Sequence, residues 1–179
     1  MNNIVLIGMM GSGKSTVGLA LANALSWRFV DLDSQLEDQE KISIAQLVKE
    51  QGMDVFRNKE TQQLRAFVES NPSECVLSTG GGIILKDENQ SLLKTLGFIV
   101  WLKASAQTTY ERIKDDSSRP LIQGQTPDQK IKSIKNILEA RADTYKQLAH
   151  QIVEVDELSC AEVANTIKQL FKSHRKTLR

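Results

Sequence analysis

The sequence predicts an α/β fold: a three-layer sandwich in which helices cover both faces of a five-stranded parallel sheet. Short apolar runs alternate along the chain with longer segments of helical periodicity. Several of these runs are continuous, which is typical of parallel strands buried on both faces. Strands that alternate with helices indicate a doubly wound sheet with right-handed crossovers. The five predicted strands span residues 4–7, 28–33, 75–78, 97–102 and 150–155.

Helical periodicity is clearest after the first strand and near the C-terminus. One apolar stripe consists of Val17, Ala20, Leu21, Ala24 and Leu25, and another of Val163, Ile167, Leu170 and Phe171. A long helical connection, about 34–72, joins the second and third strands. It is interpreted as a substrate-binding insertion over the strand ends, so residues 1–179 are expected to form a single domain.

The composition excludes several classes of protein. With 23 basic and 22 acidic residues the net charge is +1, so no overall field favours binding to nucleic acid or membranes. No segment has the length of a membrane span. Cys75 and Cys160 match no metal-ligand spacing, and their use fits a reducing compartment. We expect a soluble, cytoplasmic, monomeric protein.

A phosphate-binding loop follows the first strand. The segment "GMMGSGKS", Gly8 to Ser15, fits G-x-x-x-x-G-K-[ST] and leads into the helix that carries Val17. Glycines let backbone N–H groups face an anion, and the helix adds its positive N-terminal end. Lys14 is expected on the β- and γ-phosphates and Ser15 on Mg²⁺. The alternative is a chance glycine turn, but strand, loop and helix together favour a nucleoside triphosphate site.

Other motifs narrow the class of nucleotide-binding protein. The chain has no N-K-x-D motif, which counts against a GTPase. It also has no hydrophobic run that ends in D-E, which counts against the large motor ATPases. The choice among the remaining classes of nucleotide-binding protein must therefore come from the residues that would bind the second substrate.

Two carboxylates end the second predicted strand. Asp31 and Asp33 in "DLD" are spaced to lie on the same side of that strand. Such a pair is expected beside a cation or a polyhydroxylated ligand. The structural alternative is that Asp33 only caps the following helix.

Two arginines are expected to point inward. Arg57 shares a helix face with Glu60 and Leu64, and Arg141 interrupts the apolar stripe of the helix predicted over 128–149. An inward guanidinium is costly unless an anion accompanies it. An internal salt bridge or a snorkelling side chain would also satisfy each arginine. Together with the phosphate loop, they favour a substrate that carries a carboxylate.

Two further loops are candidates for function. Residues 115–127 are polar and interrupted by Pro120, Gly124 and Pro127, which is typical of a lid, and Arg119 there could stabilise a transferring phosphate. The segment "STGGGI", Ser78 to Ile83, follows the third strand. Its glycines are expected to let a compact ring approach the backbone, so bulk at Gly81 should block the ring substrate before ATP.

In this order, "GMMGSGKST", "DLD", "FR" with a glutamate three residues later, "TGGG", "RPL" and "R…Y…A" resemble the shikimate kinase family. The resemblance runs from about residue 4 to about residue 155. It implies the P-loop fold of nucleoside monophosphate kinases, with strand order 2-3-1-4-5. It also implies ATP-dependent phosphorylation of the 3-hydroxyl of shikimate, in aromatic amino-acid biosynthesis, with Mg²⁺ as cofactor.

The resemblance also implies roles for individual residues. ATP would be bound by Gly11, Ser12, Gly13, Lys14, Ser15, Thr16 and Arg119, the last in the lid. The metal would be held by Ser15 and Asp31. Shikimate would be bound by Asp33, Arg57, Gly80, Gly81, Gly82 and Arg141. The catalytic residues would be Lys14, Asp33 and Arg119, with Asp33 orienting or deprotonating the attacking hydroxyl.

The chain departs from the family's usual pattern at three places. Met53 stands where a glutamate is usual, Ala142 to Thr144 lack the proline that often follows the second arginine, and some relatives carry a polar residue near Leu158. Two other functions remain as alternatives. One is another small-molecule kinase of the same fold, acting on gluconate or a nucleotide, and the other is a nucleotide-binding module without catalysis.

Overall fold

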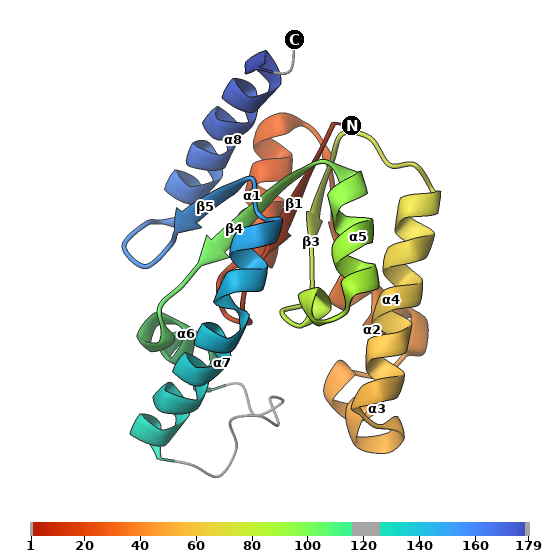
Figure 1. Ribbon diagram of the computed structural model, residues 1–179, viewed down its shortest axis with the longest axis vertical. Coiled ribbons are helices and arrows are strands. Elements are labelled where there is room, and N and C mark those ends of the chain that lie inside the picture. Colours follow the sequence, from red (N-terminus) through yellow and green to blue (C-terminus); the bar gives the residue numbers. More distant parts are fainter. Residues whose placement is uncertain (1, 116–125, 178–179) are drawn as a thin grey trace.

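The computed structural model describes residues 2–115 and 126–177, and these fold as three layers (Figure 1). The strands are β1 (Asn3–Ile7), β2 (Arg28–Asp31), β3 (Cys75–Ser78), β4 (Phe98–Lys103) and β5 (Gln151–Glu154). They form one parallel sheet in the order β2-β3-β1-β4-β5. The predicted fold class and strand order are confirmed.

Helices cover both faces of the sheet. On one face lie α1 (Lys14–Leu25) and α8 (Cys160–Thr177). On the other lie α4 (Met53–Glu69), α5 (Asp87–Leu96) and α7 (Pro127–Leu148). The remaining helices are α2 (Leu32–Glu40), α3 (Ile44–Gln51), α6 (Ala106–Ile113) and the 3₁₀ helix η1 (Ile83–Leu85).

The central strand shows why its apolar run is continuous. Ile4 and Leu6 of β1 pack in the cluster beneath α1 and α8. Val5 and Ile7 pack in the cluster beneath α4, α5 and α7. All four side chains have no exposed surface. Because successive side chains of a strand point to opposite faces, a strand covered on both sides must be apolar at every position.

The second strand is shorter than predicted. It ends at Asp31, which has extended backbone and is the N-cap of α2, because its carboxylate accepts a hydrogen bond from the Ser34 amide at 3.1 Å. Asp33 therefore lies in the first turn of α2 and not in the strand. The alternative that assigned the cap to Asp33 is wrong, because Asp31 occupies the cap position.

Loops gather at the carboxyl edge of the sheet. Since β1 and β3 are parallel neighbours, with Leu6 opposite Ser78, the phosphate loop and the glycine segment leave the sheet side by side. Helices α2, α3 and α4 pack there around a small core of their own, made of Leu36, Leu47 and Phe56. Within the described residues, no helix has both the length and the apolar character that crossing a membrane requires.

Candidate active site

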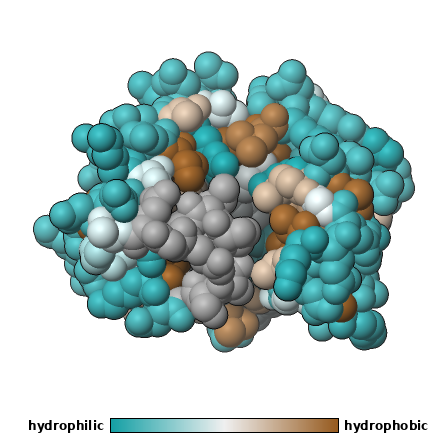
Figure 2. Space-filling model, turned by 90° about the horizontal axis from the view of Figure 1, so that it is seen from below, coloured by the Kyte–Doolittle hydropathy of each residue, from teal (hydrophilic) through white to brown (hydrophobic). Residues whose placement is uncertain are grey.

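A cavity of about 440 Å³ opens at the carboxyl edge, between the phosphate loop and helices α2 to α4. From that end of the molecule, apolar patches lie around the middle of the face and hydrophilic surface lies around its outside (Figure 2). Most of the predicted site residues line the cavity: Gly11, Gly13, Lys14, Ser15, Thr16, Asp31, Asp33, Arg57, Gly80, Gly81, Gly82 and Arg141. Arg119 and most of the predicted lid, residues 116–125, lie outside the described residues.

The phosphate loop is shaped by its glycines and closed by its lysine. Gly13 is the N-cap of α1 and has φ of 90°, a left-handed conformation that side chains disfavour. Lys14 is buried, and its ammonium donates to the carbonyl oxygens of Gly8 and Met9 at 2.9 Å each. The positive charge thus lies within the loop, at the N-terminus of a helix, as binding of a polyphosphate requires.

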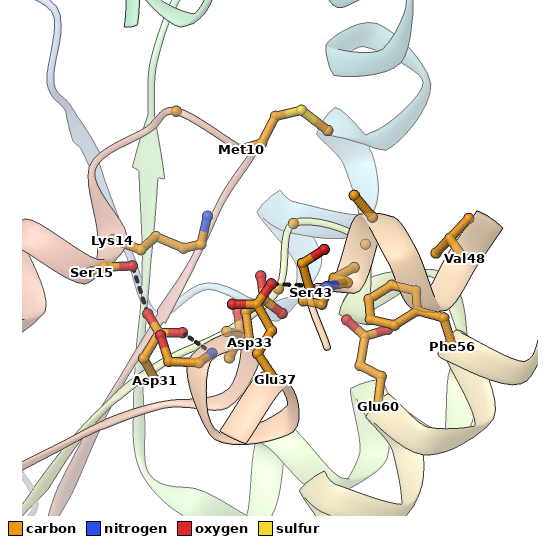
Figure 3. A pocket seen from close by; sticks show the side chains of 18 of the residues that line it. Met10, Lys14, Ser15, Asp31, Asp33, Glu37, Ser43, Val48, Phe56 and Glu60 are labelled. Atoms are coloured by element: carbon orange, nitrogen blue, oxygen red, sulfur yellow. Dashed lines mark hydrogen bonds between the residues drawn. The ribbon is translucent and has the colours of Figure 1, made fainter. Parts of the chain in front are cut away.

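Ser15 and Asp31 meet at the base of the cavity (Figure 3). The Ser15 hydroxyl donates to Asp31 Oδ2 at 2.6 Å, and the other carboxylate oxygen, Oδ1, caps α2. A hydroxyl and one carboxylate beside a phosphate loop are the oxygen donors that Mg²⁺ uses when substrate phosphates and waters complete its shell. Among the described residues no group of three or more His, Cys, Asp or Glu side chains forms an all-protein metal site. The donor set fits Mg²⁺ bound together with ATP.

Two glycines of the segment, Gly80 and Gly82, make room for side chains that line the cavity. A Cβ at Gly80 would come within 2.5 Å of Glu60 Oε1 and 2.7 Å of Asp33 Oδ1, and a Cβ at Gly82 would overlap the Arg57 guanidinium. The backbone carbonyl of Gly81 accepts a hydrogen bond from Arg141 at 3.1 Å. The glycine segment is therefore where α2, α4 and α7 deliver Asp33, Arg57 and Arg141 to one place.

The structure corrects the reason expected for Gly81. A Cβ there would lie 2.9 Å from the Met10 amide nitrogen and 3.4 Å from the Met9 carbonyl carbon, both in the phosphate loop. Bulk at this position would press on the phosphate loop and so should affect ATP as well, while the expected order, with the ring substrate blocked before ATP, stays a prediction. The missing side chain at Gly81 lets two loops pack closely, and a substrate contact by its backbone stays a prediction.

Arg57 is held by its neighbours on α4. Its guanidinium donates to Glu60 Oε2 at 2.7 Å and lies 4.7 Å from the centre of the Phe56 ring. Glu60 is only 2% exposed, and its Oε1 has no hydrogen-bond partner among the described residues. Burial raises the pKa of Glu60, while the charge of Arg57 acts in the opposite direction. The pair fixes the direction of Arg57, and one carboxylate oxygen is left for a ligand or water.

Arg141 reaches the cavity from α7, a different helix from the one that carries Arg57. Its Nη1 donates to the Gly81 carbonyl and contacts Met9 Sδ at 3.9 Å. The guanidinium is partly buried and lines the same cavity as Arg57. Two cations thus face a cavity that also contains the phosphate loop, and a ligand with one carboxylate could contact both.

Comparison with known proteins identifies the family. The family profile described as "Shikimate kinase" matches residues 10–172. A curated shikimate kinase from Marinomonas sp. is 36% identical over 97% of this chain and 94% of its own length. One from Sulfurihydrogenibium sp. is 38% identical over 96% and 99%. The chain belongs to the shikimate kinase family.

Solved structures agree with this assignment. A shikimate kinase from Acinetobacter baumannii in complex with shikimate superposes with a TM-score of 0.89 and 33% identity, over 97% of this chain and 94% of that one. A gluconokinase from Sinorhizobium meliloti has a TM-score of 0.58 and 19% identity, over 99% and 95%, which shows the fold alone. The predicted family is confirmed, and the gluconate-type alternative is not favoured.

Some residues of this family member's site were not predicted. Ile44, Val48 and Phe56 form an apolar wall of the cavity, beside Met53, which the sequence had already singled out. No motif indicated this wall, because it depends on how α3 packs against α4. Arg112 was also missed: it donates to the carbonyls of Gly11 and Val155, and so joins the phosphate loop to the end of β5. Leu158 is 38% exposed and is not among the residues that line the cavity.

Proposed function

We propose that this chain transfers the γ-phosphoryl group of ATP to the 3-hydroxyl of shikimate, giving shikimate 3-phosphate and ADP for aromatic amino-acid biosynthesis. The observation that carries the proposal is the arrangement around residues 80–82. There Asp33, Arg57 and Arg141 come together from three helices, beside the phosphate loop. Phosphoryl transfer needs chiefly positioning and charge stabilisation, and this arrangement supplies both.

The two arginines would bind the carboxylate of shikimate. Arg57 and Arg141 line one cavity from two different helices, and each is held by other protein groups before a ligand arrives. A carboxylate bound by two guanidinium groups has little freedom to rotate, because each hydrogen bond to a charged group is directional. Since the ring is rigid, this contact would place one hydroxyl toward the phosphate loop.

Asp33 would act on that hydroxyl. It lies in the first turn of α2, beside Gly80 and on the same wall as Asp31. A carboxylate there can accept the hydroxyl hydrogen and keep the oxygen lone pair directed at the phosphorus. Whether the proton leaves before or during transfer, Asp33 accepts it.

The phosphate loop would bind ATP and stabilise the charge that develops. Lys14 would give up its hydrogen bonds to the loop carbonyls and donate to the transferring phosphoryl group instead. The amides of the loop would donate to the remaining phosphate oxygens. Ser15 and Asp31 would hold Mg²⁺, which neutralises charge on the phosphates when it is bound. Arg119 and the lid are proposed to close on ATP and exclude water.

An acceptor comparison tests the function. ADP release should depend on shikimate and saturate with it in the presence of MgATP, and NMR should place the new phosphate on the 3-hydroxyl. Removal of Mg²⁺ by a chelator should stop turnover. Faster ADP release with gluconate or with a nucleoside monophosphate would instead assign a related kinase. ATP binding without turnover of any acceptor would assign a nucleotide-binding module without catalysis.

The monomeric state and the cytoplasmic location also stay predictions. Light scattering would test the first of them.

A further inference from the structure

Tyr145 is a buried tyrosine that the proposed mechanism does not use. It lies in α7 with no exposed surface, and its ring stacks on that of Trp101, with centroids 5.2 Å apart. Its hydroxyl points away from this packing and donates to the carbonyl oxygen of Gly81 at 2.7 Å. Burial raises the pKa of Tyr145 to about 12, so the hydroxyl remains a neutral donor at physiological pH.

The same carbonyl oxygen is shared with Arg141. Arg141 Nη1 donates to it at 3.1 Å, and the two residues are one helical turn apart on α7. A carbonyl oxygen has two lone pairs, and here both have a donor. Gly81 is also packed against the Met10 amide of the phosphate loop. One turn of α7 therefore holds a single carbonyl of the glycine segment with two side chains.

We propose that Tyr145 is a positioning residue that sets the direction of Arg141 toward the acceptor carboxylate. The inference rests on the proposed function, in which Arg141 binds that carboxylate. A guanidinium is planar and rigid, so fixing one nitrogen on a fixed oxygen limits the directions of its other N–H groups. The Tyr145 hydroxyl keeps that oxygen in place. Without it, the Gly81 carbonyl can rotate, and Arg141 follows or loses the contact.

The Tyr145→Phe variant separates this role from simple packing. Phenylalanine keeps the ring on Trp101 and nearly the same shape, and the hydrogen bond from the Tyr145 hydroxyl to the Gly81 carbonyl is what the substitution removes directly, so the fold should survive. A net contribution typical of one hydrogen bond predicts that the shikimate KM and the calorimetric Kd each rise about fivefold to tenfold. The KM for ATP should stay within about twofold. Packing alone would leave the shikimate constants unchanged, or would change both substrates equally, and either result overturns the inference.

Tyr110→Phe is the matched control, because it removes the hydroxyl of the chain's other tyrosine. Tyr110 lies in α6, packed near Ile113 and Ile134, and no hydrogen bond between its hydroxyl and another described residue is observed. Its shikimate KM should equal that of the wild type. The unfolding midpoint of both variants shows whether either substitution acts through stability.

An Arg141→Ala background tests the route of the effect and also distinguishes the two proposals. If Tyr145 acts through Arg141, adding Tyr145→Phe to Arg141→Ala changes the shikimate KM no further, because coupled residues are not additive. A shikimate analogue with a hydroxymethyl group in place of the carboxylate should bind the wild type and Tyr145→Phe equally.

If Arg141→Ala leaves the shikimate KM unchanged, the carboxylate clamp itself is wrong. If Arg141→Ala raises it but the two substitutions add, only the role of Tyr145 is wrong.

Discussion

Two buried polar residues at opposite ends of the parallel sheet differ in how completely the protein itself satisfies their hydrogen bonds. At the amino end, Asn3 is 1% exposed, and its side chain donates to the carbonyls of Pro72 and Leu96 and accepts from the Cys75 amide. At the carboxyl end, Glu60 is 2% exposed and lines the cavity, yet its Oε1 has no partner among the described residues. The side chain of Asn3 makes its hydrogen bonds within the protein. The second carboxylate oxygen of Glu60 remains available to a ligand.

The difference shows where stability and function lie. A buried polar group is retained at little cost when all its hydrogen bonds are made inside the protein, as at Asn3. A group left incomplete lowers stability, and it persists where a bound molecule can complete it. Substitutions at the carboxyl end should therefore affect catalysis, and those at the amino end should affect folding.

The largest effect is expected from Asp33→Ala. Loss of a group that accepts or orients a proton typically lowers turnover by about 10²–10⁴-fold, and we expect kcat to fall by that amount. ATP affinity should stay within about threefold, because the proposed role of Asp33 is on the acceptor. A coupled ADP assay and calorimetry with a nonhydrolysable ATP analogue measure the two. Asp38→Ala, an exposed position on α2, is the control. Equal losses of ATP affinity and turnover would contradict the assignment.

Arg57→Ala should act mainly on the acceptor. Loss of a charge-assisted hydrogen bond predicts a rise of about tenfold to a hundredfold in the shikimate KM, with the ATP KM nearly unchanged. Because Glu60 would lose its partner inside the protein, Arg57→Lys should be made as well, to keep a cation beside it. Arg65→Ala, an exposed arginine on α4, is the control. An unchanged shikimate KM in both Arg57 variants would exclude the carboxylate clamp.

Asn3→Leu should change stability and leave catalysis alone. It removes all three hydrogen bonds at the amino end and leaves buried backbone groups without partners, at a cost of about 2 kcal/mol in the free energy of unfolding. Denaturant unfolding measures the loss, and kcat/KM per folded molecule should match the wild type. The neighbouring Asn2→Leu is the control, since no hydrogen bond between the Asn2 side chain and another described residue is observed. A drop in kcat/KM without a loss of stability would break the proposed separation of the two ends.

The smallest effect is a pH dependence at the amino end. His150 Nδ1 accepts a hydrogen bond from the Ile99 amide at 3.0 Å, which requires the neutral ring. Burial, together with the nearby His174, lowers the pKa of His150. The unfolded chain then binds the proton more readily, so this stabilisation is complete above a pH of about 6.5 and is lost as the pH falls below that value.

A comparison with His150→Asn measures this effect. An asparagine side-chain oxygen can accept from the Ile99 amide but does not titrate, so the unfolding midpoint of the variant should fall less between a pH of about 7 and about 5 than that of the wild type. The groups of the active site play no part in this bond. Parallel pH profiles for the two proteins would show that His150 contributes nothing.

Most of the fold and the phosphate half of the site could be predicted because their signals are local. The motif from Gly8 to Ser15 contains its own strand end, loop and helix start. The five strands were found from short apolar runs, each within one residue of the observed bounds except β2, which ends at Asp31, two residues before the predicted end. That end could not be predicted, because Asp31 and Asp33 are both suitable cap residues, and only the structure shows that Asp31 caps α2.

The residues of the proposed acceptor site could be selected from the sequence, but their arrangement around one cavity could not. An inward Arg141 and the Arg57–Glu60 pair follow from helical spacing. Their meeting at residues 80–82 does not, because it needs α4, α7 and the segment after β3 to pack together. The sequence determines which groups are present and which strands must be buried, since side-chain chemistry and periodicity are local properties. Only the tertiary structure decides which glycine makes room for which side chain and which buried atoms lack partners, since those contacts join residues distant along the chain.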